Sequence, residues 1–166
     1  MKISSETKAI LKNFATINSG IKVDSGNQLK TISNMKNILA VATIPETFDK
    51  SFSIYNLVEF LGATSLLENP EFNFNDSSLS IADADTSLTY FYASEGMVTS
   101  PEKMITMPDA EINIELSSTL LTELQKAASV LGVNDLILTS DGTKIQMQVT
   151  DKKNTTSNTF SRTVGE

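Results

Sequence analysis

The sequence of 166 residues contains no histidine, no cysteine and no tryptophan. Without histidine and cysteine the chain has no imidazole or thiolate ligand for a transition metal, no disulfide, and no Ser–His or cysteine nucleophile system. Carboxylates and lysines remain available for acid–base work or for a Mg²⁺ or Ca²⁺ site. We therefore expect a protein that is not an enzyme and that uses no cofactor and no metal.

Basic side chains are also scarce. Thirteen lysines and arginines stand against twenty acidic residues, which gives a formal net charge of -7. The field of such a chain repels phosphate at long range and argues against a general nucleic-acid binder, unless basic side chains gather locally.

Long apolar runs are missing as well. The first residues are polar where a signal peptide would need an apolar run, and no window reaches the roughly 18 apolar residues of a membrane span. We expect a soluble protein with no membrane partner.

Three segments share one order of elements, a strand, a helix and three strands. In the first, residues 2–4 predict a strand, and a helix follows from about Ser5, capped by Ser4 or Ser5. The three further strands are predicted at 21–24, 29–33 and 38–44. Pro45 is expected to end the last of them, because proline cannot donate to a ladder.

The second and third segments repeat this order. The second predicts a strand at 51–55, a helix at 57–67 capped by Asn56, and strands at 71–75, 79–82 and 88–93. The third predicts a strand at 111–116, a helix from the cap Ser117 to about Leu131 with Gly132 at its end, and strands at 135–139, 144–149 and 159–164. Residues 94–108 have no periodicity and contain Gly96, Pro101 and Pro108, which predicts a linker between domains.

These modules predict an α+β fold in which two modules pack into one domain, with two helices on one face of antiparallel sheets. Residues 1–93 form such a domain from modules 1–44 and 50–93. Residues 109–166 supply a single module, which is half of a second domain. Its helix has no second helix in the chain to lie beside.

One segment carries a resemblance to a known family. Residues 11–21, LKNFATINSGI, strongly resemble the start of the sliding clamp, the DNA polymerase processivity factor, of T-even-type phages. Further matches are Phe60-Leu61-Gly62 with Ser65-Leu66, Ile81-Ala82-Asp83-Ala84, and the tail 161–166. The resemblance covers nearly the whole chain and implies the DNA-clamp fold. It also implies that the last module of the second domain is missing.

The resemblance implies a function. Subunits of this family join head to tail in a closed ring, with helices around the central hole and sheets outside. The chain is thus expected to encircle duplex DNA without sequence specificity and to tether the replicative DNA polymerase, after a clamp loader has opened the ring. We expect the protein to act in the cytoplasm of the infected bacterium. The alternative is an acidic, β-rich phage structural or adhesion protein, which the Ser/Thr-rich strands and the acidic composition suggest.

The resemblance also assigns residues. The DNA-facing candidates are Lys8 and Lys12, one turn apart on the first helix and opposite Ile10 and Phe14, and Lys126 in the third helix. The ordinary alternative for these lysines is a solvated helix face. The last strands of the second and third modules are expected to pair across the subunit boundary, through Leu88, Thr89, Tyr90 and Phe91 on one side and Thr159, Phe160, Ser161 and Arg162 on the other.

The single third module is too small to bury its apolar face unaided, so we expect self-association. A second copy could cover that face and give a dimer, whereas the family forms a trimer.

Three other groups have less specific interpretations. Asp83 and Asp85 are expected to form a turn rather than a metal site, since two carboxylates lack the further ligands of a calcium loop. The run 90–92 is expected to alternate between core and surface rather than to stack on bases. Met97, Met104 and Met107 either fill gaps in the linker or offer an adaptable docking surface.

Overall fold

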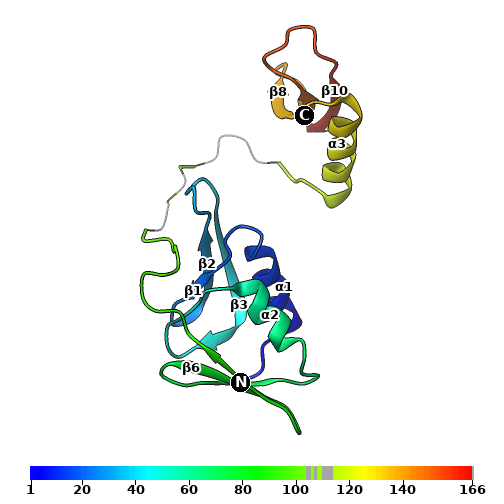
Figure 1. Ribbon diagram of the computed structural model, residues 1–166. Helices are drawn as coiled ribbons and strands as arrows, with labels where there is room; N and C mark the ends of the chain where they lie inside the picture. The colour runs from blue at the N-terminus through cyan, green and yellow to red at the C-terminus, as the bar shows by residue number, and fades with distance from the viewer. Residues whose placement is uncertain (104–105, 107, 110–113, 166) are drawn as a thin grey trace. The chain divides into compact units, whose positions relative to one another are not determined.

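The computed structural model covers the chain and describes residues 1–103, 106, 108–109 and 114–165 (Figure 1). The chain divides into two compact units, Met1–Ile105 and Thr106–Glu166. The first unit combines two helices with antiparallel sheets and the second combines one helix with one antiparallel sheet, in keeping with the predicted α+β fold.

Two capped helices belong to the first unit. Helix α1 (Ser5–Phe14) begins where the Ser4 hydroxyl oxygen accepts a hydrogen bond of 3.1 Å from the Thr7 amide, and it buries Leu11 and Phe14. Helix α2 (Leu57–Thr64) is capped by Asn56 and ends three residues before the predicted Leu67. The Thr64 hydroxyl there donates to a helical carbonyl, which competes with continuation of the helix.

The strands of the first unit form three small antiparallel sheets. They are β1 (Ile21–Val23) with β4 (Phe52–Ile54), β2 (Gly26–Ile32) with β3 (Leu39–Phe48), and β5 (Glu71–Phe74), β6 (Ser78–Ala82) and β7 (Ser87–Phe91) in that order. Helices α1 and α2 lie side by side over one core, which includes the fully buried Leu29, Leu79 and Ile81 (Figure 1).

Pro45 does not end its strand, so that expectation is wrong. Strand β3 runs through Pro45 to Phe48. The register between β2 and β3 shifts between the pairs Gly26–Phe48 and Gln28–Thr43. Pro45 lies in this irregular stretch, where the ladder is interrupted, and its missing amide therefore costs no regular pairing.

The predicted strand at residues 2–4 is not formed either. Instead, the amino group of Met1 donates to the Phe72 carbonyl at 2.9 Å, and the Phe72 amide donates to the Met1 carbonyl at 2.8 Å. The Ser4 amide donates to the Glu46 carboxylate, and the chain turns there into α1. Pairing before α1 is thus confined to the first residue.

In the first unit, the segment before each helix pairs with the strand after the other helix. Strand β4 precedes α2 and pairs with β1, which follows α1. Met1 precedes α1 and pairs with Phe72 of β5, which follows α2. Its two modules therefore complete each other reciprocally.

The second unit holds one helix and one sheet. Helix α3 (Ser118–Leu131) is capped by Ser117 and ends at Gly132 in the left-handed conformation, with φ of 68°. Strands β8 (Asp135–Ser140), β9 (Ile145–Thr150) and β10 (Phe160–Gly165) form a sheet in the order β10-β9-β8. Its core consists of Leu124, Val133, Met147 and Val149.

Of the strand predicted at 111–116, residues 111–113 lie outside the described part of the chain. Residues 114–116 form no strand, and no described strand pairs with them. Ile114 and Leu116 are 36% and 42% exposed. A strand needs a neighbouring ladder, and here none is present among the described residues.

Candidate functional site

Lys8 and Lys12 lie one turn apart on α1. Lys12 is exposed on the side turned away from the core, whereas Lys8 is half-buried because it flanks the face that holds Leu11 and Phe14. Among the described residues neither lysine has an acidic partner within ion-pair distance. Their positive charges are therefore open to a ligand.

Lys126 belongs to the second unit, on α3. It is exposed, and it lies on nearly the opposite side of the helix from the buried Leu124. The acidic residue one turn before it, Glu123, faces Arg162 of β10 at 3.9 Å. Helix α2 differs from both, because its outer side presents Val58 and Glu59 and the helix carries no basic residue. Among the three described helices, basic residues therefore occur on α1 and α3 and not on α2.

The predicted boundary residues of β7 alternate in direction. Leu88 and Tyr90 pack against the core, whereas Thr89 and Phe91 are exposed, Phe91 by 71%. The Tyr90 ring meets Phe60 edge to face at 5.3 Å. Its hydroxyl donates to the Asn56 carbonyl at 3.2 Å.

Burial, with a smaller contribution from Glu59, raises the pKa of Tyr90 to about 12. The Tyr92 ring lies 5.3 Å from that of Phe52. The predicted alternation of residues 90–92 between core and surface is confirmed.

The residues of the third module that are predicted to lie at the subunit boundary are Thr159, which precedes β10, and the first three residues of β10. Thr159 donates a hydrogen bond of 3.0 Å to the Thr150 hydroxyl, and Phe160 packs against the core of the second unit. Ser161 is exposed, and Arg162 forms its ion pair with Glu123. Both β7 and β10 stand at an edge of their described sheets, so each offers backbone groups to a further strand.

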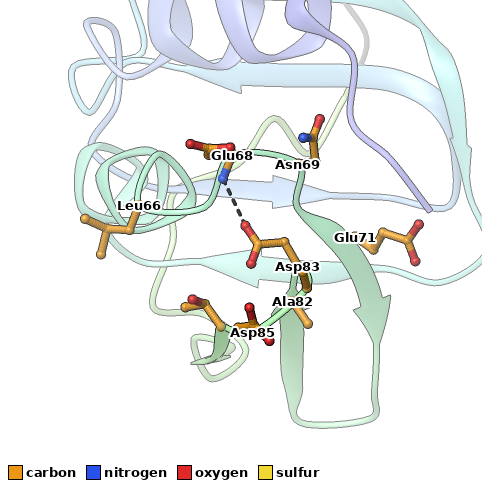
Figure 2. A pocket seen from close by; sticks show the side chains of 9 residues that line it. Leu66, Glu68, Asn69, Glu71, Ala82, Asp83 and Asp85 are labelled. Carbon is orange, nitrogen blue, oxygen red and sulfur yellow. Dashed lines mark hydrogen bonds between the residues drawn. The ribbon is translucent and has the colours of Figure 1, made fainter.

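A pocket of about 640 Å³ lies between the end of α2 and the turn that joins β6 to β7 (Figure 2). Its carboxylates include Glu68, Glu71, Asp83 and Asp85. Asp83 accepts a hydrogen bond of 3.0 Å from the Glu68 amide, and its own amide donates to the Thr86 carbonyl at 3.0 Å. These bonds form a turn, as predicted. Over the described residues, no group of three or more acidic side chains is arranged to hold a metal ion.

Asn18 is a key residue that sequence reasoning did not single out. It is buried, and its amide nitrogen donates to the carbonyls of Ile32 at 3.0 Å and Thr99 at 2.9 Å. Its side-chain oxygen accepts from the Gly20 amide at 3.1 Å. The Asn-x-Gly pattern is typical of such a turn and could have indicated it. Asn18 thereby holds part of the segment predicted as a linker against the first unit.

Residues 4–99 match the family of DNA polymerase processivity factors. The chain belongs to this family. It is 33% identical to the sliding clamp of Vibrio phage KVP40, in an alignment that covers the whole chain and 78% of that protein. It is 35% and 31% identical to the sliding clamps of Enterobacteria phage T4 and Escherichia phage RB69, over 87% of the chain. The chain spans 64% of the length of each of these two proteins.

The solved structure of proliferating cellular nuclear antigen from Entamoeba histolytica shares the fold, with a TM-score of 0.58 at 13% identity. The superposition covers 95% of this chain and 69% of that one. The predicted DNA-clamp fold is confirmed. The alternative of a phage structural or adhesion protein finds no support in these relatives.

The described residues include no helix with the length and apolar character that crossing a membrane requires.

Proposed function

We propose that this phage processivity factor forms a ring around duplex DNA and holds the replicative polymerase on its template. The observation that carries the proposal is its similarity along the whole chain to a phage sliding clamp. The helices support it, since Lys12 of α1 and Lys126 of α3 are exposed on helix sides away from the buried residues, with Lys8 at the flank of α1. The chain itself catalyses nothing, and it acts in the cytoplasm of the infected bacterium.

In this proposal Lys8, Lys12 and Lys126 face the DNA. A protein that slides must hold phosphates without reading bases, and lysines on exposed helix sides make contacts that exchange rapidly. Enclosure by a ring, rather than affinity, keeps the duplex in place. The net charge of -7 is therefore compatible with DNA encirclement.

Subunits join where edge strand β7 of one chain pairs with edge strand β10 of the next. Both strands lack a second neighbour among the described residues. Phe91 supplies an exposed aromatic side chain at this edge, and aromatic residues contribute strongly to protein interfaces. The carbonyl and amide groups of the two edges provide the remaining contacts.

The polymerase docks on the segment that follows β7. Met97 in this segment is 58% exposed, and methionine adapts to apolar partners of varied shape. Met104 and Met107 lie outside the described residues. A clamp loader opens the ring and supplies the ATP chemistry, because the chain contains no glycine-rich phosphate-binding loop with lysine.

Primer extension on a long, singly primed circular template tests this function. The DNA polymerase and clamp loader of a related phage such as KVP40 are combined with the chain, under a trap that captures any polymerase that dissociates. We expect longer products in a single binding event with the chain than without it. Product lengths that do not change with the chain would refute the tethering role.

A further inference from the structure

Arg162 is the one arginine in the sequence, and it lies on strand β10. It pairs in register with the buried Met147 of β9, and Phe160, two residues before it, packs against the same core. Because side chains alternate along a strand, Arg162 points to the face of the sheet that carries α3. Its ion pair with Glu123 of α3 agrees with this direction.

The ion pair that holds Arg162 within its own chain is loose. Its Nη1 atom lies 3.9 Å from Oε1 of Glu123, and the two side chains are 57% and 38% exposed. Charge-assisted hydrogen bonds are shorter, about 2.7–2.9 Å. A guanidinium group carries five N–H donors in a fixed plane, so Arg162 can bind a second carboxylate while it keeps the first.

A carboxylate stands beside the other boundary strand, β7. Glu59 is the one charged residue of α2, and it is exposed. No ion pair in the described part of the chain includes it. Tyr90 of β7 points toward α2, where its ring meets Phe60. Burial and then the charge of Glu59 raise the pKa of the Tyr90 hydroxyl to about 12, which places the Glu59 carboxylate on the β7 side of α2.

The head-to-tail contact of the proposed function brings these two side chains to one place. Strand β7 of one chain then lies next to β10 of the following chain, with both helices on the DNA side of the joined sheet. Side chains on the same face of neighbouring strands have Cβ atoms about 4.5–8 Å apart. Arg162 therefore lies beside Tyr90, and its long side chain extends toward the carboxylate next to the Tyr90 hydroxyl.

We propose that Arg162 of one chain forms an ion pair with Glu59 of the next, and that this pair selects which two strand edges join. The inference rests on the head-to-tail contact of the proposed function and adds its specificity. Backbone groups of an edge strand pair with any exposed strand and therefore do not select a partner. Charges do select, because two β10 edges would bring arginine against arginine and two β7 edges glutamate against glutamate.

Exchange of the two charges in the full chain tests the pair. Light scattering over a dilution series at low salt measures the association of Glu59→Arg, of Arg162→Glu and of the variant with both changes. Each single reversal places like charges opposite each other, and we expect association to weaken about tenfold or more. The variant with both changes keeps the net charge of -7 and restores an opposite pair, so its association should return close to that of the unmodified chain.

Two matched controls make the same changes of charge elsewhere. Glu71→Arg, on β5, and Lys153→Glu, after β9, are at exposed positions and should leave association as in the unmodified chain. Recovery in the variant with both changes also separates the ion pair from loss of folding, because each substitution is still present in it.

Single reversals that leave association unchanged, or a variant with both changes that does not recover, would overturn the ion pair. Phe91→Glu separates this failure from failure of the contact itself. If Phe91→Glu dissociates the chains while the charge variants have no effect, the ion pair alone is wrong. A chain that keeps the single-chain mass of 18.0 kDa at tens of micromolar, or association that none of these variants alters, would overturn the head-to-tail contact and the ion pair with it.

Discussion

The side-chain amide of Asn18 donates a hydrogen bond of 2.9 Å to the backbone carbonyl of Thr99, which lies 81 residues further along the chain. A second bond from the same nitrogen reaches the carbonyl of Ile32 at the end of β2. One buried side chain thus connects the turn after α1 to a strand and to the segment after β7.

Replacing this residue by alanine should release the segment around Thr99. Asn18→Ala leaves two carbonyls and the Gly20 amide without their partner, and we expect a loss of about 2–3 kcal/mol in the free energy of unfolding of the first unit. Urea denaturation measures the loss, and hydrogen exchange of residues 94–99 should accelerate. Asn13→Ala, on the exposed side of α1, is the control. It should leave the free energy of unfolding and the exchange of residues 94–99 unchanged within error. Equal effects of the two variants would contradict the anchoring role.

Gly20 is required for close packing. A Cβ atom at this position would lie 2.9 Å from the carbonyl oxygens of Ile54 and Tyr55, and 3.1 Å from the Val98 side chain. Backbone cannot shift as a flexible side chain does, so Gly20→Ala should destabilise the first unit by about 1–3 kcal/mol. Gly62→Ala is the matched control, because nothing lies near its Cβ position in α2, and it should stabilise by about 0.5–1 kcal/mol. Thermal unfolding should therefore show a lower melting temperature for Gly20→Ala and a higher one for Gly62→Ala than for the parent chain. Shifts of the same sign would contradict this packing.

Glu46 should make stability depend on pH in the acid range. Burial raises the pKa of its carboxyl, but hydrogen bonds from the Thr7 hydroxyl and from Ser4 outweigh this, and the pKa lies below its ordinary value of 4.5. A pKa that is lower in the folded state adds stability above the unfolded pKa, and this stability disappears as the pH falls through the folded pKa.

We therefore expect Glu46→Gln to lower the free energy of unfolding by about 1–2 kcal/mol near neutral pH. The difference in stability between the variant and the parent chain should shrink below pH 4.5. Melting temperatures measured across this range test the expectation. Glu71→Gln, at an exposed residue of β5, removes the same charge without these bonds and should show little difference. A cost at Glu46 that is the same at all pH values would rule out this ionic contribution.

Removal of the candidate DNA-facing lysines should weaken binding to duplex DNA. For the triple variant Lys8→Ala, Lys12→Ala and Lys126→Ala, the slope of log K against log salt should fall by roughly 0.9 for each phosphate that the variant no longer neutralises. Fluorescence anisotropy with a short duplex at low salt measures both affinity and slope. The control triple Lys144→Ala, Lys152→Ala and Lys153→Ala changes the net charge equally at exposed positions near the β8–β9 and β9–β10 turns. If the two triples behave alike, the helix lysines are only a solvated face.

Local chemistry made the starts of the three described helices and the end of α3 predictable from sequence, whereas α2 ends earlier than predicted. Ser4, Asn56 and Ser117 each accept a bond from the amide three residues later in the helix start, and Gly132 takes the left-handed conformation that ends α3. The spacing of Lys8 and Lys12 likewise placed them on one side of α1.

Features that depend on distant parts of the chain were not predictable in this way. Pro45 stays within β3 because the register with β2 is irregular there, which is a property of two strands and not of one. Residues 114–116 have the alternation of a strand, but no strand among the described residues pairs with them. The bond from Asn18 to Thr99 joins segments whose closeness no local pattern reveals.

Encirclement of DNA by the chain is tested most directly by comparing its retention on circular and on linear DNA. The chain is loaded onto a nicked circular plasmid with the clamp loader of a related phage and ATP, and bound protein is then separated by gel filtration. We expect the chain to co-elute with the circle and to be lost when one restriction cut makes the same DNA linear. Equal retention on circular and linear DNA, or none on either, would contradict encirclement.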